Sequence, residues 1–123
     1  MAGEKYKILI AEDEKPMARA LEMKLNHEGF EAKAVFNGEL ALESLLSEKF
    51  ALVLIDLMMP KVDGFKVLET INEANLAVPV IVLSNLNQDE DEQKAKDLGA
   101  KAFFVKSNTP IAEIVNYVKK FLS

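Results

Sequence analysis

The 123-residue chain contains no cysteine, only one arginine, Arg19, and only one histidine. Without cysteine there can be no disulfide framework and no thiolate metal site, which fits a reducing compartment. A single arginine leaves little scope for bidentate clamps on phosphate groups. Any metal site in this chain must therefore rely mainly on oxygen ligands, which favour a hard divalent cation.

Positive charge is also scarce, because 15 Lys+Arg face 20 Asp+Glu and give a net charge of −5. Such a balance disfavours direct binding to nucleic acid or to an anionic membrane. No apolar run approaches the length of a membrane span, and residues 1–7 are too short and polar for a signal peptide. We expect a cytoplasmic protein with no direct nucleic-acid or membrane partner.

What the chain does contain is a regular alternation of strand-like and helix-like segments. Half of its residues are hydrophobic, which is enough for a core, and its length suggests a single domain over residues 1–123. Apolar runs predict strands at residues 6–11, 30–36, 52–56, 78–83 and 101–105. Apolar periodicity predicts helices at about residues 16–28, 40–46, 65–71, 89–98 and 110–121. We read residues 37–38 and 63–64 as turns.

Five strand–helix units in succession predict an α/β fold, a doubly wound (βα)5 parallel sheet covered by helices on both faces. The first, third and fourth strands are the most apolar and belong in the middle of the sheet, whereas the second and fifth carry charge and belong at its edges. With right-handed crossovers, the strand order 2-1-3-4-5 satisfies this pattern. That order places a topological switch point between the first and third strands.

Polar residues follow four of the predicted strands at their carboxyl ends, where open α/β sheets bind ligands. Taken singly, each has an ordinary structural explanation, such as a helix cap, a turn residue or a solvated strand end. A carboxylate directly after four buried aliphatic residues is harder to explain in this way, because burying it without partners is costly. Their joint placement indicates a site formed by Glu12, Asp13, Asp56, Ser84 and Lys106.

Three carboxylates in one cleft repel each other, and a divalent cation relieves the repulsion. Oxygen ligands favour Mg²⁺, which proteins hold with one or two carboxylates and several waters. A metal beside a nucleophilic carboxylate, with an ammonium group opposite, is suited to phosphoryl transfer. The residues therefore indicate a site for Mg²⁺-dependent phosphoryl transfer, with Lys106 and Ser84 on the phosphoryl side.

At this point the chain resembles the receiver (CheY-like) domain of two-component response regulators, which has a flavodoxin-like fold. The resemblance covers the whole chain. It rests on Glu12-Asp13, on Asp56 followed by Met59-Pro60 and Asp63-Gly64, on Ser84, and on Leu98-Gly99-Ala100 leading to Lys106.

The resemblance implies that Asp56 accepts a phosphoryl group from a phosphohistidine on a sensor histidine kinase or phosphotransfer protein. Asp13, Asp56 and the backbone carbonyl of Met58 would ligate Mg²⁺, and Glu12 would act through an ordered water. Lys106 would pair with the phosphoryl group. The protein would catalyse at most its own Mg²⁺-dependent phosphorylation and dephosphorylation, so it is not expected to be an enzyme acting on a separate substrate.

The resemblance also implies a switch. Ser84 would move to donate a hydrogen bond to the phosphoryl group, and Phe103 would turn into the vacated space. This movement would remodel the face formed by the fourth helix, the fifth strand and the fifth helix. Core packing alone would also explain Phe103.

Several positions depart from the usual pattern of the family. Phe103 stands where Tyr is frequent, Ser107 where Pro is usual, and Asn85 where a small residue is usual. We expect the apolar flank made by Met58 and Leu86 to exclude water and to give a long-lived phosphoryl group.

Two rival functions differ in class from a phosphoacceptor. A pseudo-receiver that binds proteins without being phosphorylated is motivated by Asn85 and Ser107. A Mg²⁺-dependent phosphatase would need a second carboxylate two residues after Asp56, where this chain has Met58. Nucleotide binding is disfavoured, because neither a Walker-type loop nor a G-x-G-x-x-G turn is present.

The sequence leaves two alternatives for the target on which the protein acts. No effector domain follows Ser123, so we expect either a stand-alone receiver acting on a downstream protein target or a piece of a larger regulator. Without the Arg–Asp pairs of one dimerising subfamily, a phosphorylation-dependent dimer stays an open alternative.

Overall fold

The computed structural model describes residues 5–85 and 89–123 and contains a five-stranded sheet in the order β2-β1-β3-β4-β5, in which every neighbouring pair is parallel. This confirms the predicted fold class and strand order. Among the described residues, no helix has the length and apolar character needed to cross a membrane. The strands are β1 (Lys7–Ala11), β2 (Glu31–Val35), β3 (Leu52–Asp56), β4 (Val80–Ser84) and β5 (Ala102–Val105). The helices are α1 (Lys15–His27), α2 (Gly38–Ser47), α3 (Gly64–Glu73), α4 (Asp89–Asp97) and α5 (Ile111–Phe121), with a three-residue 3-10 turn, η1 (Lys106–Asn108), before α5.

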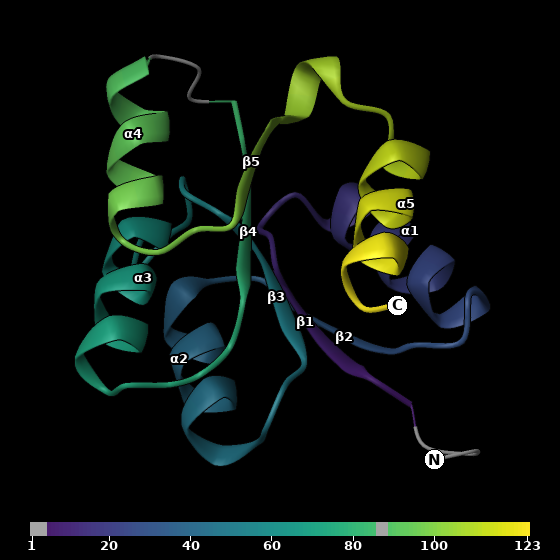
Figure 1. Cartoon of the computed structure of the whole chain (residues 1–123), viewed down its shortest axis with the longest axis horizontal. Helices are drawn as coiled ribbons and strands as arrows, with labels where there is room; N and C mark the ends of the chain where they lie inside the picture. Colours follow the sequence, from purple (N-terminus) through teal and green to yellow (C-terminus); the bar gives the residue numbers. More distant parts are fainter. Residues whose placement is uncertain (1–4, 86–88) are drawn as a thin grey trace.

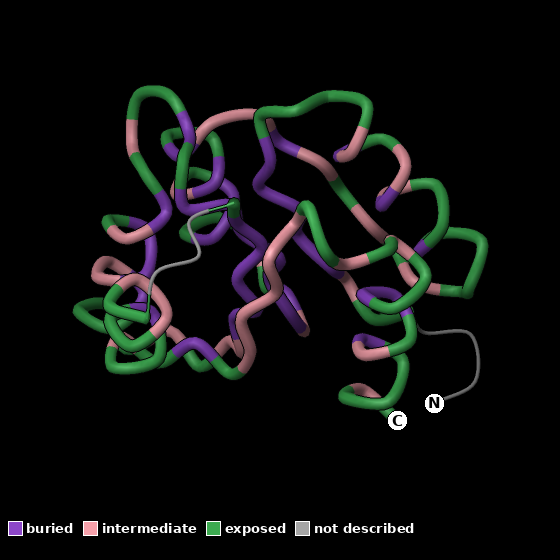
Figure 2. The backbone as a smooth tube through the Cα atoms, turned by 90° about the horizontal axis from the view of Figure 1, so that it is seen from above, coloured by how far each residue is buried: buried purple, intermediate pink, exposed green. Residues whose placement is uncertain are grey.

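Helices cover both faces of the sheet, with α1 and α5 on one side and α2, α3 and α4 on the other (Figure 1). Because successive strand side chains point to opposite faces, each central strand contributes to two cores. Leu52 and Leu54 pack with residues of α1 and α5, whereas Val53 and Ile55 pack with residues of α2 and α3. The central strands β1, β3 and β4 accordingly form the buried centre of the molecule, and exposed residues lie around the outside (Figure 2).

Two helices begin with a capping residue followed by glycine. The side chain of Asn37 accepts the N–H of Leu40 at the start of α2, and Asp63 accepts the N–H of Lys66 at the start of α3. The sequence reading assigned both pairs to turns. In the structure they are helix starts, because the short polar side chain satisfies an N–H group that the first helical turn leaves free.

Gly64 brings the start of α3 against the end of β3. A Cβ atom at this position would lie 2.5 Å from the carbonyl oxygen of Asp56 and 2.7 Å from the Cα atom of Leu57. Only glycine fits so close an approach. The backbone behind Asp56 is therefore packed directly against a helix.

The two helices that flank β5 are anchored to different extents. In α4, the only buried residue is Ala95, and the first turn is entirely acidic. In α5, Ile114, Val115 and Val118 are all buried. With only one buried side chain, α4 is the less firmly held of the two helices.

Candidate functional site

The predicted polar residues meet at the carboxyl end of the sheet, which lies at the top of Figure 1. Glu12 and Asp13 follow β1, and Asp56 ends β3. Ser84 ends β4, and Lys106 is the first residue of η1, directly after β5. The pairing of β1 with β3, β3 with β4 and β4 with β5 places these strand ends side by side.

Lys106 is the centre of this cluster. Its Nζ atom lies 2.9 Å from Oε1 of Glu12 and 3.0 Å from Oδ2 of Asp56, and it also donates a hydrogen bond to Glu14. The Lys106 side chain is 5% exposed, so these carboxylates surround an ammonium group that is almost out of water. Burial opposes the charged form of Lys106, but the hydrogen bonds to Glu14, Glu12 and Asp56 outweigh it and raise its pKa.

Glu14 is a member of the cluster that the sequence reading missed. Its position two residues after Glu12, close to the end of β1, is the feature of the sequence that could have indicated its membership. An acidic residue at the start of a surface helix is also typical of a solvated residue, and Glu14 is indeed the N-cap residue of α1. Its carboxylate nevertheless reaches Lys106, which lies 92 residues away in the sequence.

Glu12 is the most perturbed carboxylate of the site. It is 1% exposed, and its Oε2 atom accepts the N–H of Glu14 at 2.9 Å. Its Oε1 atom forms the ion pair with Lys106, although the angles of this contact are not those of a good hydrogen bond. Burial raises the pKa of Glu12 to about 7, against the opposing effects of Lys106 and of the Glu14 N–H. The charge of Asp56 adds to this rise.

The carboxylates of this site fit a divalent cation. One oxygen from each of Glu12, Asp13 and Asp56 lies within 4.8 Å of the others. Carboxylate oxygens are the donors that suit Mg²⁺, and one ammonium group does not balance the charge of three carboxylates. The N–H of Met58 donates to Oδ1 of Asp56 at 3.1 Å, so the Met58 backbone lies beside this carboxylate.

The predicted switch residues lie on the neighbouring strands β4 and β5. Ser84 is fully buried at the end of β4, and Phe103 on β5 is half-buried against the core on the α2, α3 and α4 side. Beyond them, the side chain of Asn85 accepts the N–H of Ser107 at 3.0 Å, and the Lys106–Ser107 peptide is trans. The Met58 side chain is 57% exposed, whereas Leu86 lies outside the described residues.

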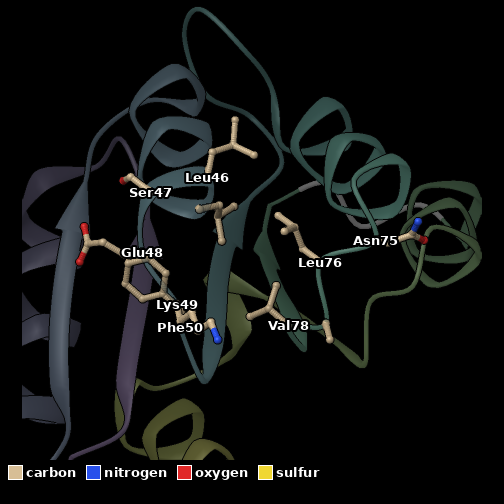
Figure 3. Close-up of a pocket in the computed structure, with 10 residues that line it drawn as sticks. Leu46, Ser47, Glu48, Lys49, Phe50, Asn75, Leu76 and Val78 are labelled. Atoms are coloured by element: carbon tan, nitrogen blue, oxygen red, sulfur yellow. The ribbon is translucent and has the colours of Figure 1, made fainter.

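A hollow of about 580 Å³ lies at the opposite, amino end of the sheet. It is formed by the end of α2, the segment before β3 and the segment before β4 (Figure 3). Leu46, Phe50, Leu76 and Val78 give it an apolar lining. Glu48, at its rim, points away from Leu76 (Figure 3) and pairs with two lysines. The potential metal ligands are thus at one end of the sheet and this cavity at the other.

Comparisons with known proteins agree with this geometry. The family model of the response regulator receiver domain matches residues 8–119. The transcriptional regulatory protein DltR of Streptococcus agalactiae is 37% identical over 100 residues, which is 81% of this chain and 45% of that protein. The response regulator ArlR of Staphylococcus saprophyticus is 35% identical over 100 residues, again 81% of this chain and 45% of that protein. This chain spans less than half the length of these curated relatives.

Two similar solved structures are receiver domains. The receiver domain of the Francisella response regulator 1452 has a TM-score of 0.87 and 29% identity, covering 97% of this chain and 100% of that chain. The BeF3-activated receiver domain of DrrB has a TM-score of 0.85 and 28% identity, covering 97% and 98% of the two chains. A CheY-like receiver protein from Methanospirillum hungatei, 22% identical, shares the fold with a TM-score of 0.90 over 97% of this chain and 94% of that one. The chain therefore belongs to the receiver domain family of two-component response regulators.

Proposed function

We propose that Asp56 is the phosphoacceptor of this receiver domain. The observation that carries the proposal is the environment of the Asp56 carboxylate, which is 3% exposed and has a partner on each oxygen. Oδ1 accepts the N–H of Met58, and Oδ2 lies 3.0 Å from the Lys106 ammonium group. A buried carboxylate held between a backbone donor and a lysine is oriented for attack on a phosphorus atom.

The phosphoryl donor is a phosphohistidine on a sensor histidine kinase or a phosphotransfer protein. A carboxylate oxygen of Asp56 forms a bond to phosphorus as the bond between phosphorus and the histidine nitrogen breaks, and the imidazole nitrogen keeps the electron pair. Lys106, already beside the carboxylate, neutralises the developing charge on the phosphoryl oxygens. Ser84 donates a hydrogen bond to one of them.

Asp13, Asp56 and the backbone carbonyl of Met58 hold Mg²⁺, and Glu12 acts through an ordered water. The three carboxylates that cluster within 4.8 Å support this assignment. When bound, the metal supplies positive charge that offsets the repulsion between the carboxylates and the incoming phosphoryl group. Glu12 must be deprotonated to take part, and its raised pKa ties the state of the site to pH near neutrality.

Phosphorylation is read out through Ser84, Phe103 and the face formed by α4, β5 and α5. The weak anchoring of α4, with only Ala95 buried, supports movement of that helix. The target is a downstream protein or an effector domain carried by a longer chain. Relatives that are named transcriptional regulators, and of which this chain spans less than half, support the second arrangement.

Incubation with acetyl phosphate and Mg²⁺, followed by intact mass spectrometry, tests the proposal. The protein should gain the mass of one phosphoryl group, and Asp56→Asn should gain none. Asp63→Asn, which changes an exposed cap residue at the same end of the sheet, is the matched control and should be labelled normally. An unlabelled wild-type protein would instead support a pseudo-receiver that acts by binding alone.

The decay of the phosphoryl group tests the role of the apolar flank. The Met58 N–H donates to Asp56, so an apolar side chain starts from the backbone beside this carboxylate, and we infer that it slows the access of water to the phosphoryl group. We expect the label to persist for minutes or longer after acetyl phosphate is removed. Loss within seconds would rule out this part of the proposal.

A further inference from the structure

Two residues that depart from the family pattern contact each other. Asn85 is larger than the residue usually found after the switch hydroxyl, and Ser107 replaces the usual proline after the lysine. In the structure, the N–H of Ser107 donates a hydrogen bond to Oδ1 of Asn85 at 3.0 Å. A proline at position 107 would have no N–H to donate, so the contact requires both departures together.

The hydrogen bond joins the two loops that carry the phosphoryl-binding residues. Asn85 directly follows Ser84, and Ser107 directly follows Lys106. The last pair in the β4–β5 ladder is Ser84 with Val105, so this bond ties the chains together just beyond the end of the sheet. The position of Ser84 is thereby linked to the position of the Lys106 turn.

The Lys106 turn is itself fixed on the β5 side. The hydroxyl of Thr109 donates to the carbonyl oxygen of Val105 at 2.8 Å, and the N–H of Thr109 donates to the carbonyl oxygen of Lys106 at 3.4 Å. Both bonds hold the short turn η1 closed around Ser107. The N–H that donates to Asn85 therefore belongs to a turn whose backbone is held by two further hydrogen bonds.

The direction of the expected switch follows from the strand order. Because β4 lies between β3 and β5, movement of Ser84 toward Asp56 on β3 is movement away from Ser107, which follows β5. Because Asn85 is the next residue along the chain, we expect its hydrogen bond to Ser107 to stretch or break when Ser84 reaches a phosphoryl group.

We propose that Asn85 is a positioning residue that restrains Ser84 in the unphosphorylated protein through its hydrogen bond to the Ser107 N–H. The inference rests on the proposed function of Asp56 and Ser84 and adds to it a restraint that opposes the switch. Removing this hydrogen bond should favour the activated arrangement. The bond stabilises only the unphosphorylated state, so without it the switch costs less free energy.

Binding of beryllofluoride in the presence of Mg²⁺ tests the restraint, with Asn85→Ala, Ser107→Pro and the double variant compared with the wild type. Each single variant should reach half-saturation at an about two- to tenfold lower beryllofluoride concentration, the range expected for one hydrogen bond. The double variant should show no further shift, since both changes remove the same bond. Ser107→Ala keeps the N–H and is the matched control, with an expected half-saturation equal to that of the wild type.

Additive shifts would overturn the inference, because they would mean that Asn85→Ala acts by making room for the phosphoryl group. Unchanged or weaker binding in the single variants, or a shift in Ser107→Ala, would overturn it as well. If wild-type protein fails to bind beryllofluoride at all, the proposed function fails instead.

Amide hydrogen exchange tests the bond without any phosphoryl analogue, and it serves equally if Ser107→Pro does not fold. The Ser107 amide should exchange about two- to tenfold faster in Asn85→Ala than in the wild type. Equal exchange rates in the two proteins would show that Asn85 does not hold this N–H.

Discussion

Two lysine–glutamate clusters stand at opposite ends of the same sheet, and their charges are arranged in opposite ways. At the carboxyl end, one ammonium group, that of Lys106, faces the carboxylates of Glu12, Glu14 and Asp56. At the amino end, one carboxylate, that of Glu48, lies 2.6 Å from Lys7 and 2.7 Å from Lys33.

The two glutamates respond in opposite directions. Hydrogen bonds from Lys33 and Lys7 lower the pKa of Glu48 to about 2, whereas burial raises the pKa of Glu12 to about 7. Glu48 is half-exposed and pairs with two lysines, so its negative charge is favoured in the folded protein. Glu12 is buried among other acids, so its charge is disfavoured unless a further cation is present. The amino-end cluster contributes to stability, and the carboxyl-end cluster is arranged to take up positive charge.

The largest expected contrast between the clusters comes from removing the central lysine. Lys106→Met leaves Glu12 and Asp56 buried without their counter-charge, which should lower the free energy of unfolding by about 3 kcal/mol in EDTA. Urea unfolding near neutral pH measures the loss. Glu48→Gln, the control at the amino end, should lose far less, because its partners are half-exposed. Equal losses would mean that the two clusters do not differ as described.

The pH dependence of stability should distinguish Glu12. Its folded-state pKa of about 7 exceeds its ordinary value of 4.5, so the folded protein binds more protons than the unfolded chain between these values. Stability in EDTA should therefore fall as the pH rises through this window, by at most about 3 kcal/mol. Urea unfolding across a pH series measures this slope, and Glu12→Gln should lack it. A wild-type slope that Glu12→Gln retains would assign the effect to another group.

Magnesium should stabilise the folded protein only by binding to the carboxyl-end cluster. At ten times its dissociation constant, determined by titration calorimetry, Mg²⁺ should raise the free energy of unfolding by about 1.4 kcal/mol. Asp13→Asn should lose most of this gain, and Glu48→Gln should keep it. Stabilisation that survives in Asp13→Asn would place the metal elsewhere.

The smallest expected effect concerns Glu48 in acid. Its folded-state pKa lies below its ordinary value of 4.5, so its contribution to stability is complete above that value and is lost as the pH falls toward about 2. Glu48→Gln should flatten this part of the pH profile of thermal unfolding. Because the group is half-exposed, high salt should have the same effect as the substitution. An unchanged acid profile in the variant would contradict the prediction.

The strand order could be predicted because burial is visible in the sequence. β3 and β4 are buried at every position, whereas β2 alternates between exposed and half-buried residues up to its last residue, Val35, which is buried. The ends of the strands depend on individual residues, as β4 shows. It was predicted to begin at residue 78 but begins at Val80, because Pro79 has no N–H to give to the ladder.

The members of the site on strand ends could also be predicted, because parallel strands bring their carboxyl ends to one edge. The contacts between loops could not. Glu14 and Lys106 are 92 residues apart, and Asn85 and Ser107 are 22 residues apart. Which side chains meet there depends on the path of the short turn η1 and on the angle at which α1 leaves β1, and no periodicity in the sequence records either.

The close approach of Gly64 to β3 has a consequence for mutational scanning. Every other residue would place a Cβ atom within 2.5 Å of the Asp56 carbonyl oxygen, so the helix or the strand end would have to shift. In a library selected for phosphotransfer, position 64 should tolerate substitution almost as poorly as position 56, although it has no side chain to take part in chemistry. Such intolerance would measure how rigidly the phosphoacceptor backbone must be held, and a scan scored by folded abundance alone would separate it from the intolerance of Asp56.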